Sequence, residues 1–97
     1  MKIIKQAVAG TLESSDLLVT VEPNDSGLDI VIQSEVVKQF GKQIRAAVAE
    51  TLAKLDVDRG TVVIEDKGAL DYAIRARVQA AVLRGAGSVD VNWGQLS

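Results

Sequence analysis

The sequence predicts an α+β fold: a two-layer sandwich in which two helices cover a mainly antiparallel sheet of about four strands. Four short runs, residues 6–12, 17–22, 28–33 and 61–66, alternate in polarity or are rich in β-branched residues, as strands are. Two longer stretches, residues 34–55 and 68–84, repeat apolar side chains at helical spacing. With 97 residues, the chain is expected to form a single domain over residues 1–97.

The first two strands are expected to form a β-hairpin, because only about four polar residues separate them. On the second strand, the predicted core face carries Leu17, Val19 and Val21. Leu18 lies on the other face, either as an ordinary surface leucine or as a docking contact. Small residues at positions 7, 9 and 10 indicate that another segment packs close to the first strand.

The third strand is expected to extend this hairpin into a meander, with its core face formed by Leu28, Ile30 and Ile32. A helix separates it from the fourth strand, so these two strands should run parallel in a βαβ unit. Ser34 and Asp66 are suited to cap the two helices.

Each predicted helix has an apolar stripe for the core. The first stripe comprises Val37, Phe40, Ile44, Val48, Thr51 or Leu52, and Leu55. The second comprises Leu70, Ile74, Val78, Ala81 and Val82. Gly85 and Gly87 suit the end of the second helix. Beyond them, residues 88–93 are a candidate edge strand, and Trp93 either packs under the sheet or contacts a partner.

The composition argues against several functions. A net charge of -2 gives no basic surface for nucleic acid, and three aromatic residues are too few for base stacking. No apolar stretch approaches the ~20 residues of a membrane span, and the N-terminus lacks the apolar core of a signal peptide. We therefore expect a cytoplasmic protein that binds neither nucleic acid nor membranes. The absence of histidine and cysteine makes catalysis by the chain improbable.

The hairpin turn is the most informative stretch, because it presents two adjacent hydroxyls, Ser14 and Ser15, at an exposed tip. Glu13 and Asp16 flank them, but no histidine is present to activate either serine. A hydroxyl without a base is better suited to being modified than to acting as a nucleophile. From composition alone, such a turn is usually a plain hairpin loop.

The run Ala7-Val8-Ala9-Gly10-Thr11-Leu12-Glu13-Ser14-x-Asp16 resembles the N-terminal signature of the citrate lyase acyl carrier protein family, the gamma chain. Residues 66–71, followed by Arg75-Ala76-Arg77, also resemble this family, and residues 40–45 do so more loosely. The resemblance implies that Ser14 carries a covalent 2'-(5''-phosphoribosyl)-3'-dephospho-CoA group through a phosphodiester bond. Ser15 lies where the family tolerates variation.

The same resemblance implies a noncatalytic carrier subunit. Its arm would hold acetyl and citryl thioesters while citrate is cleaved to oxaloacetate and acetate. The implied partners are the alpha and beta chains of citrate lyase and the transferase that attaches the group. The alternative is a noncatalytic ligand-sensing or assembly module, because small sheet-and-helix domains often serve that role.

The remaining charged residues allow two interpretations each. Glu13 and Asp16 either help the transferase to recognise the turn or are solvated. Arg75 and Arg77 point in nearly opposite directions around a helix, so they cannot form one patch. We expect both to lie on a solvated face, although one of them is a candidate contact for the arm's phosphates or a partner subunit. The basic stripe Lys38, Lys42 and Arg45 is either a solubilising face or a docking site.

Overall fold

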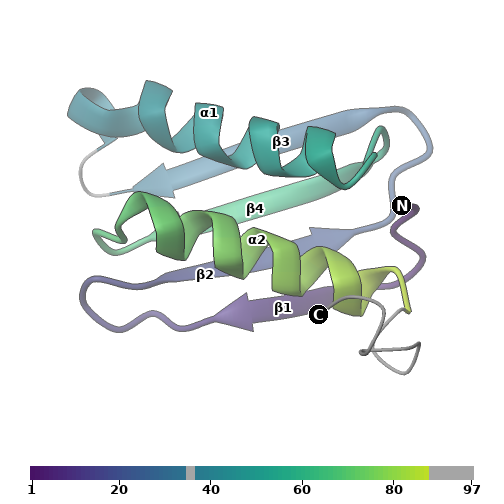
Figure 1. The fold of residues 1–97 in the computed structure, drawn as a ribbon, viewed down its shortest axis with the longest axis horizontal. Helices are drawn as coiled ribbons and strands as arrows, with labels where there is room; N and C mark the ends of the chain where they lie inside the picture. Colours follow the sequence, from purple (N-terminus) through teal and green to yellow (C-terminus); the bar gives the residue numbers. More distant parts are fainter. Residues whose placement is uncertain (35–36, 88–97) are drawn as a thin grey trace.

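The computed structural model describes residues 1–34 and 37–87. In chain order its elements are β1 (Ala7–Gly10), β2 (Leu17–Glu22), β3 (Leu28–Ser34), α1 (Val37–Lys54), β4 (Gly60–Asp66) and α2 (Asp71–Gly85) (Figure 1). All four expected strands and both expected helices are present. The candidate strand at 88–93 and Trp93 lie outside the described residues.

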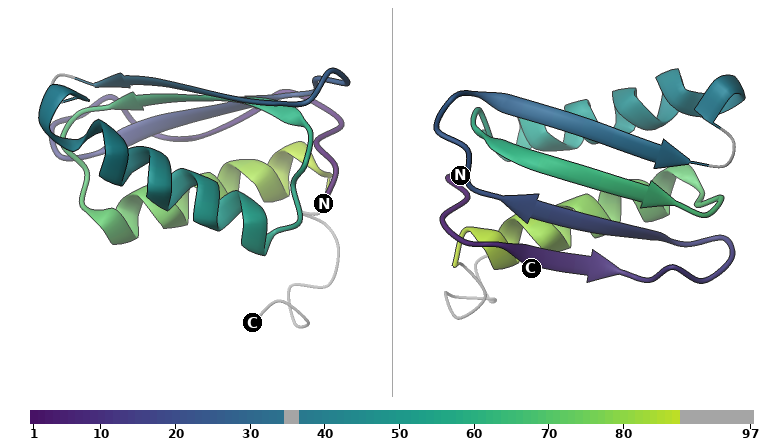
Figure 2. Two further views of the ribbon diagram at one scale, coloured as in Figure 1. Left: turned by 90° about the horizontal axis from the view of Figure 1, so that it is seen from above. Right: turned by 180° about the vertical axis from the view of Figure 1, so that it is seen from behind.

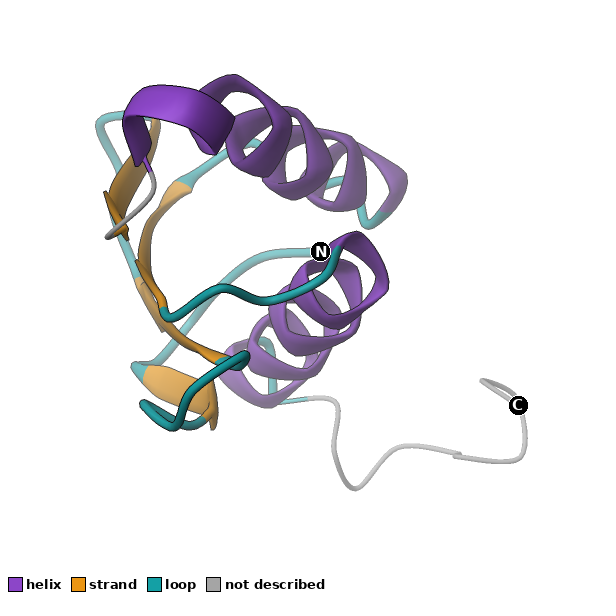
Figure 3. Ribbon diagram, turned by 90° about the vertical axis from the view of Figure 1, so that its left-hand side faces the viewer, coloured by secondary structure: helices purple, strands orange, loops and turns teal. Residues whose placement is uncertain are grey.

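The four strands form one sheet in the order β1-β2-β4-β3. β2 pairs antiparallel with both β1 and β4, whereas β3 pairs parallel with β4. Both helices cover the same face of the sheet (Figure 2, left; Figure 3). The predicted fold class is therefore confirmed, as is the parallel βαβ unit.

The predicted meander is wrong, because β4 lies between β2 and β3. Burial supplies the physical reason. The inward side chains of β4, Val62 and Ile64, are fully buried, whereas those of β3 are only partly buried or exposed. The strand with the most completely buried β-branched residues thus takes a central position, and β3 takes an edge.

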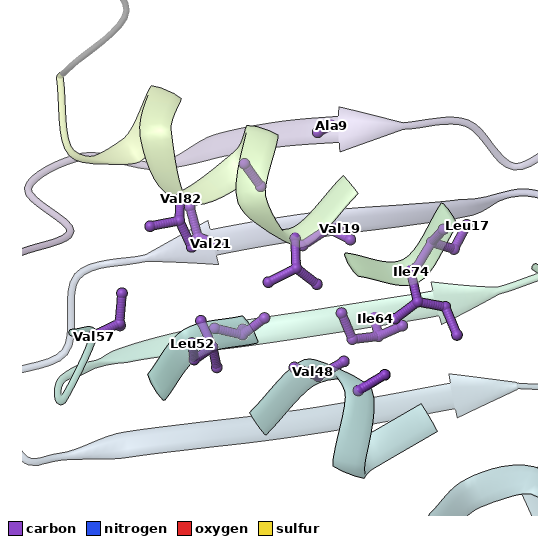
Figure 4. Close-up of a cluster of buried hydrophobic side chains, with 14 of the residues drawn as sticks. Ala9, Leu17, Val19, Val21, Val48, Leu52, Val57, Ile64, Ile74 and Val82 are labelled. Atoms are coloured by element: carbon purple, nitrogen blue, oxygen red, sulfur yellow. The ribbon is translucent and has the colours of Figure 1, made fainter. Parts of the chain in front are cut away.

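The core lies between the sheet and the two helices (Figure 4). The predicted inward residues of β2 are all fully buried, as are Val48 and Leu52 of α1 and Val78 and Val82 of α2. Among the predicted core residues whose burial the structure describes, which leaves out Val37, three are exposed instead: Leu28, Phe40 and Leu70. Leu28 begins β3, Phe40 lies in the first turn of α1 and Leu70 precedes α2, so all three are near the starts of their elements, where the opposing layer covers the apolar stripe less.

The start of α2 also differs from the expectation. The helix begins at Asp71, and its N-cap residue, Leu70, makes no side-chain capping bond. Asp66 does not cap the helix. Its buried carboxylate accepts hydrogen bonds from the Ala69 backbone N–H and from the Ser34 hydroxyl, both at 2.9 Å. Asp66 thereby fastens the ends of the parallel strands β3 and β4 to the segment that leads into α2.

The small residues of β1 are explained by α2, which packs across this strand. A Cβ on Gly10 would lie 3.3 Å from the Arg77 side chain and 1.9 Å from the Leu17 carbonyl oxygen. The expectation of a close neighbour at β1 is confirmed. The packing of α2 on β1 also brings Arg77 to the hairpin loop.

Candidate functional site

The β1–β2 loop, residues 11–16, lies at the end of the molecule where β4 ends and α2 begins (Figure 1). The Asp16 backbone N–H donates to the Glu13 carbonyl oxygen at 3.1 Å, which closes a turn with Ser14 and Ser15 at its centre. Both serines are exposed, and Ser15 has a φ of 67°. The turn thus holds Ser14 at the outer bend of the hairpin.

A single carboxylate, Asp16, organises this loop. It accepts hydrogen bonds from the Thr11 hydroxyl at 2.7 Å and from the Leu17 backbone N–H at 2.8 Å. Arg77 of α2 adds a bidentate contact, with Nε at 3.2 Å and Nη2 at 2.9 Å. Bidentate arginine–carboxylate pairs fix orientation as well as distance. The loop is therefore tied to α2 as well as to its own strands.

These hydrogen bonds change the acidity of Asp16. The Thr11 hydroxyl, then Arg77, then the Leu17 N–H lower its pKa from 3.8 to about 2. A carboxylate with so low a pKa is a weak base, and its oxygens are already occupied by donors. Asp16 is thus suited to hold the loop in place and unsuited to take a proton from a serine.

The loop is also fixed to the segment between β4 and α2. The Ser15 backbone N–H donates to the Lys67 carbonyl oxygen at 2.8 Å, and the Lys67 N–H donates to the Asp16 carbonyl oxygen at 2.9 Å. Within the described part of the chain, the hydroxyls of Ser14 and Ser15 make no hydrogen bond. The backbone of the turn is anchored while the hydroxyl of Ser14 stays accessible.

Arg75 and Arg77 of α2 diverge as expected and both remain partly exposed, but each is also paired with a carboxylate. Arg75 pairs with Asp71 and with Glu50 of α1, each at 2.7 Å. Arg77 pairs with Asp16 at the opposite flank. Since α2 lies between α1 and the hairpin, each flank meets a neighbour. No spacing in the sequence indicates the Asp16–Arg77 pair, because 61 positions separate its members.

Two cavities lie at this end of the molecule. One, of about 300 Å³, is lined by Leu12, Gln33, Ser34, Glu65, Asp66 and Lys67. The other, of about 370 Å³, lies between the N-terminal turns of α1 and α2 and is mostly apolar. Within residues 1–34 and 37–87, no group of three or more acidic side chains is arranged to hold a metal ion.

Comparison with known proteins places the chain among acyl carriers. A sequence model of the family described as malonate decarboxylase delta subunit (MdcD) matches residues 4–85. The citrate lyase acyl carrier protein of Albidiferax ferrireducens is 63% identical over 97 residues, 99% of each chain. That of Pectobacterium carotovorum subsp. carotovorum is 58% identical and covers 99% of this chain and 100% of the relative. The protein of that name from Enterobacter sp. (strain 638) is 57% identical over the whole of both chains.

The chain belongs to the citrate lyase acyl carrier protein family. This confirms the resemblance drawn from residues 7–16 and 66–71. The match to the family sequence model extends over the whole sheet, both helices and the Ser14 loop. No described helix is both long and apolar enough to cross a membrane.

Proposed function

We propose that this chain is the acyl carrier subunit of citrate lyase, with a 2'-(5''-phosphoribosyl)-3'-dephospho-CoA group attached to Ser14 through a phosphodiester bond. One observation carries the proposal: an exposed serine hydroxyl stands on an anchored turn in a chain that has no histidine and no cysteine. The names of the family's members agree with a carrier. The chain positions the acyl group, and its partners catalyse the reactions of that group.

The Ser14 loop fits such a group. Esterifying an exposed hydroxyl that has no hydrogen-bond partner in the described residues breaks no contact of the fold. The anchors of the turn, Asp16 and the Lys67 backbone, use other atoms and stay intact. When attached, the group supplies the thiol for acetyl and citryl thioesters, which this cysteine-free chain lacks.

The fixed loop gives a tethered arm a defined origin. Tethering keeps an acyl group at an effective concentration around millimolar near neighbouring active sites, without release between steps. We expect those sites to belong to the alpha and beta chains of citrate lyase, and a dedicated transferase to attach the group. We further expect residues 1–97 to act as one carrier domain in the cytoplasm.

Intact mass spectrometry tests this function. After co-expression with the attachment enzymes and the two catalytic chains, the wild-type chain should gain the mass of the group. Ser14→Ala should abolish the gain because it removes the attached oxygen. Ser15→Gly is the matched control: it removes the neighbouring hydroxyl but suits the φ of 67°, so it should be modified like the wild type. An unmodified wild-type chain would favour a ligand-sensing or assembly module.

A further inference from the structure

The end of the molecule that carries Ser14 also gathers large exposed apolar side chains. Leu12 of the hairpin loop is 53% exposed, and Phe40 near the start of α1 is 47% exposed. Leu70 and Tyr72, at the start of α2, are 63% and 73% exposed. The starts of both helices and the hairpin loop all lie at the left end of the molecule in Figure 1. Large apolar side chains exposed at one end of a molecule are candidates for an interaction site.

The cavity of about 370 Å³ lies within this surface. Its walls include Phe40 and Ile44 of α1 on one side and Leu70 and Ile74 on the other. Asp66 and Gly68 also line it, at the end of β4. The cavity is large enough for one or two apolar side chains of a partner. We call the four exposed side chains, together with the cavity that Phe40 and Leu70 line, the apolar end surface.

The apolar end surface is joined directly to the Ser14 loop. Ser15 donates its backbone N–H to Lys67, which immediately precedes the cavity residue Gly68. Leu12 lines the second cavity together with Asp66 and Lys67, and Asp66 lines both cavities. A protein that contacts Ser14 therefore has this surface beside it.

From this geometry we infer that the apolar end surface docks the enzyme that esterifies Ser14. This inference rests on the proposed function. In that step the Ser14 Oγ–phosphorus bond forms while a phosphoanhydride bond of the donor breaks. The polyphosphate leaving group takes the electron pair, and the hydroxyl proton passes to a base of the enzyme. We assign this base to the enzyme, because Asp16 is engaged by its donors and the chain has no histidine.

The step itself indicates which partner docks here. Bond formation at Oγ requires the transferase to touch the hairpin loop, and a standard interface of about 800 Å² per partner extends well beyond six residues. On the proposed function, the catalytic chains react at the thiol end of the arm, so their chemistry forms no bond to Ser14. The complementary surface should offer an apolar side chain to the cavity and a basic group to Glu13. The Glu13 carboxylate is exposed, with no ion pair in the described residues.

The test compares two exposed leucines. Leu70→Asp charges the apolar end surface, whereas Leu28→Asp, at the opposite end of the sheet, is the matched control. Attachment to the purified apo chain is followed by intact mass at increasing chain concentration, with the transferase and its donor. We expect Leu70→Asp to raise KM at least about tenfold with kcat within about twofold, and Leu28→Asp to change neither. Phe40→Ser should repeat the effect from the opposite wall of the cavity.

The outcomes separate the two proposals. A wild-type chain that gains no mass contradicts the proposed function itself. A modified wild type with unchanged KM in both Leu70→Asp and Phe40→Ser overturns only the docking surface. If KM is unchanged but these variants hydrolyse the acetyl thioester of the loaded chain faster, the cavity shelters the arm, and the docking inference is also overturned. Thermal unfolding of each variant checks that the fold persists.

Discussion

At the scale of single residues, the contrast between Asp16 and Ser14 explains how the loop works. Asp16 is bound by a hydroxyl, a backbone N–H and a guanidinium, whereas Ser14 stands exposed beside it. The turn is thus rigid at its base and accessible at its tip. Rigid placement of an accessible atom lowers the entropic cost of bringing it into another enzyme's active site.

The acidity of Asp16 tests this arrangement. A carbon-detected NMR titration of its carboxyl should show a midpoint at about 2, and Arg77→Ala should raise it toward 3.8. Arg75→Ala, which removes an arginine two residues away without touching the loop, should leave the midpoint unchanged. A wild-type midpoint near 3.8, or no response to Arg77→Ala, would contradict the network.

The sign of the pH effect follows from the lowered pKa. The Asp16 carboxylate binds a proton more weakly in the folded state than in the unfolded state. The stabilisation is therefore fully present above pH 3.8 and is lost as the pH falls through about 2. In Asp16→Asn, this part of the pH dependence of unfolding should disappear.

Two glycines offer a second test at this scale. Gly10 and Gly68 have nearly the same φ, 97° and 95°, so alanine is strained to a similar extent at both. They differ in surroundings: a Cβ at Gly10 would meet the Leu17 carbonyl oxygen at 1.9 Å, whereas Gly68 has open space. We expect Gly10→Ala to lower the free energy of unfolding by at least about 2 kcal/mol more than Gly68→Ala. Equal costs in urea denaturation would show that the Gly10 contact is relaxed at little expense.

At the scale of elements, each helix has an arginine that donates a hydrogen bond to the edge strand beside it. Arg84 of α2 donates to the Val8 carbonyl oxygen of β1 at 2.7 Å, and Arg45 of α1 donates to the Ile30 carbonyl oxygen of β3 at 3.3 Å. Unpaired edge carbonyls are templates for pairing with another chain, and a charged side chain over the edge blocks that pairing. Each of the two arginines thereby covers one carbonyl group of an edge strand.

The role of these two contacts can be tested by removing both arginines. Arg84→Ala and Arg45→Ala combined should increase self-association at high concentration, because each edge then presents a free carbonyl without a charge above it. Sedimentation velocity would detect it, with Arg75→Ala as the control for losing a helix arginine. A double variant as monomeric as the wild type would show that the edges need no such cover.

The elements also show what the sequence can predict. Strands and helices follow from local periodicity, so the sequence predicts all six elements and most of the buried residues of β2, α1 and α2. The sequence did not reveal the position of β4, since the strand order depends on which strands compete best for the centre. It also missed the Asp16–Arg77 pair, which only the packing of α2 on the hairpin creates.

At the scale of the whole molecule, the two ends differ. The end opposite Ser14 is closed by the N-terminal segment: Ile3 is buried there, close to Gly60 and Gly85. The other end holds the Ser14 loop, both cavities and the apolar end surface. The fold thus places the proposed attachment site and the proposed docking surface at one end of the molecule.

The central claim is that Ser14 carries a group which this chain cannot make for itself. The most direct measurement is tandem mass spectrometry of the peptide spanning residues 6–38, from the chain purified from its own source. We predict that the mass of the phosphoribosyl-dephospho-CoA group is localised to Ser14. A peptide without added mass, or a group localised to Ser15, would contradict the account.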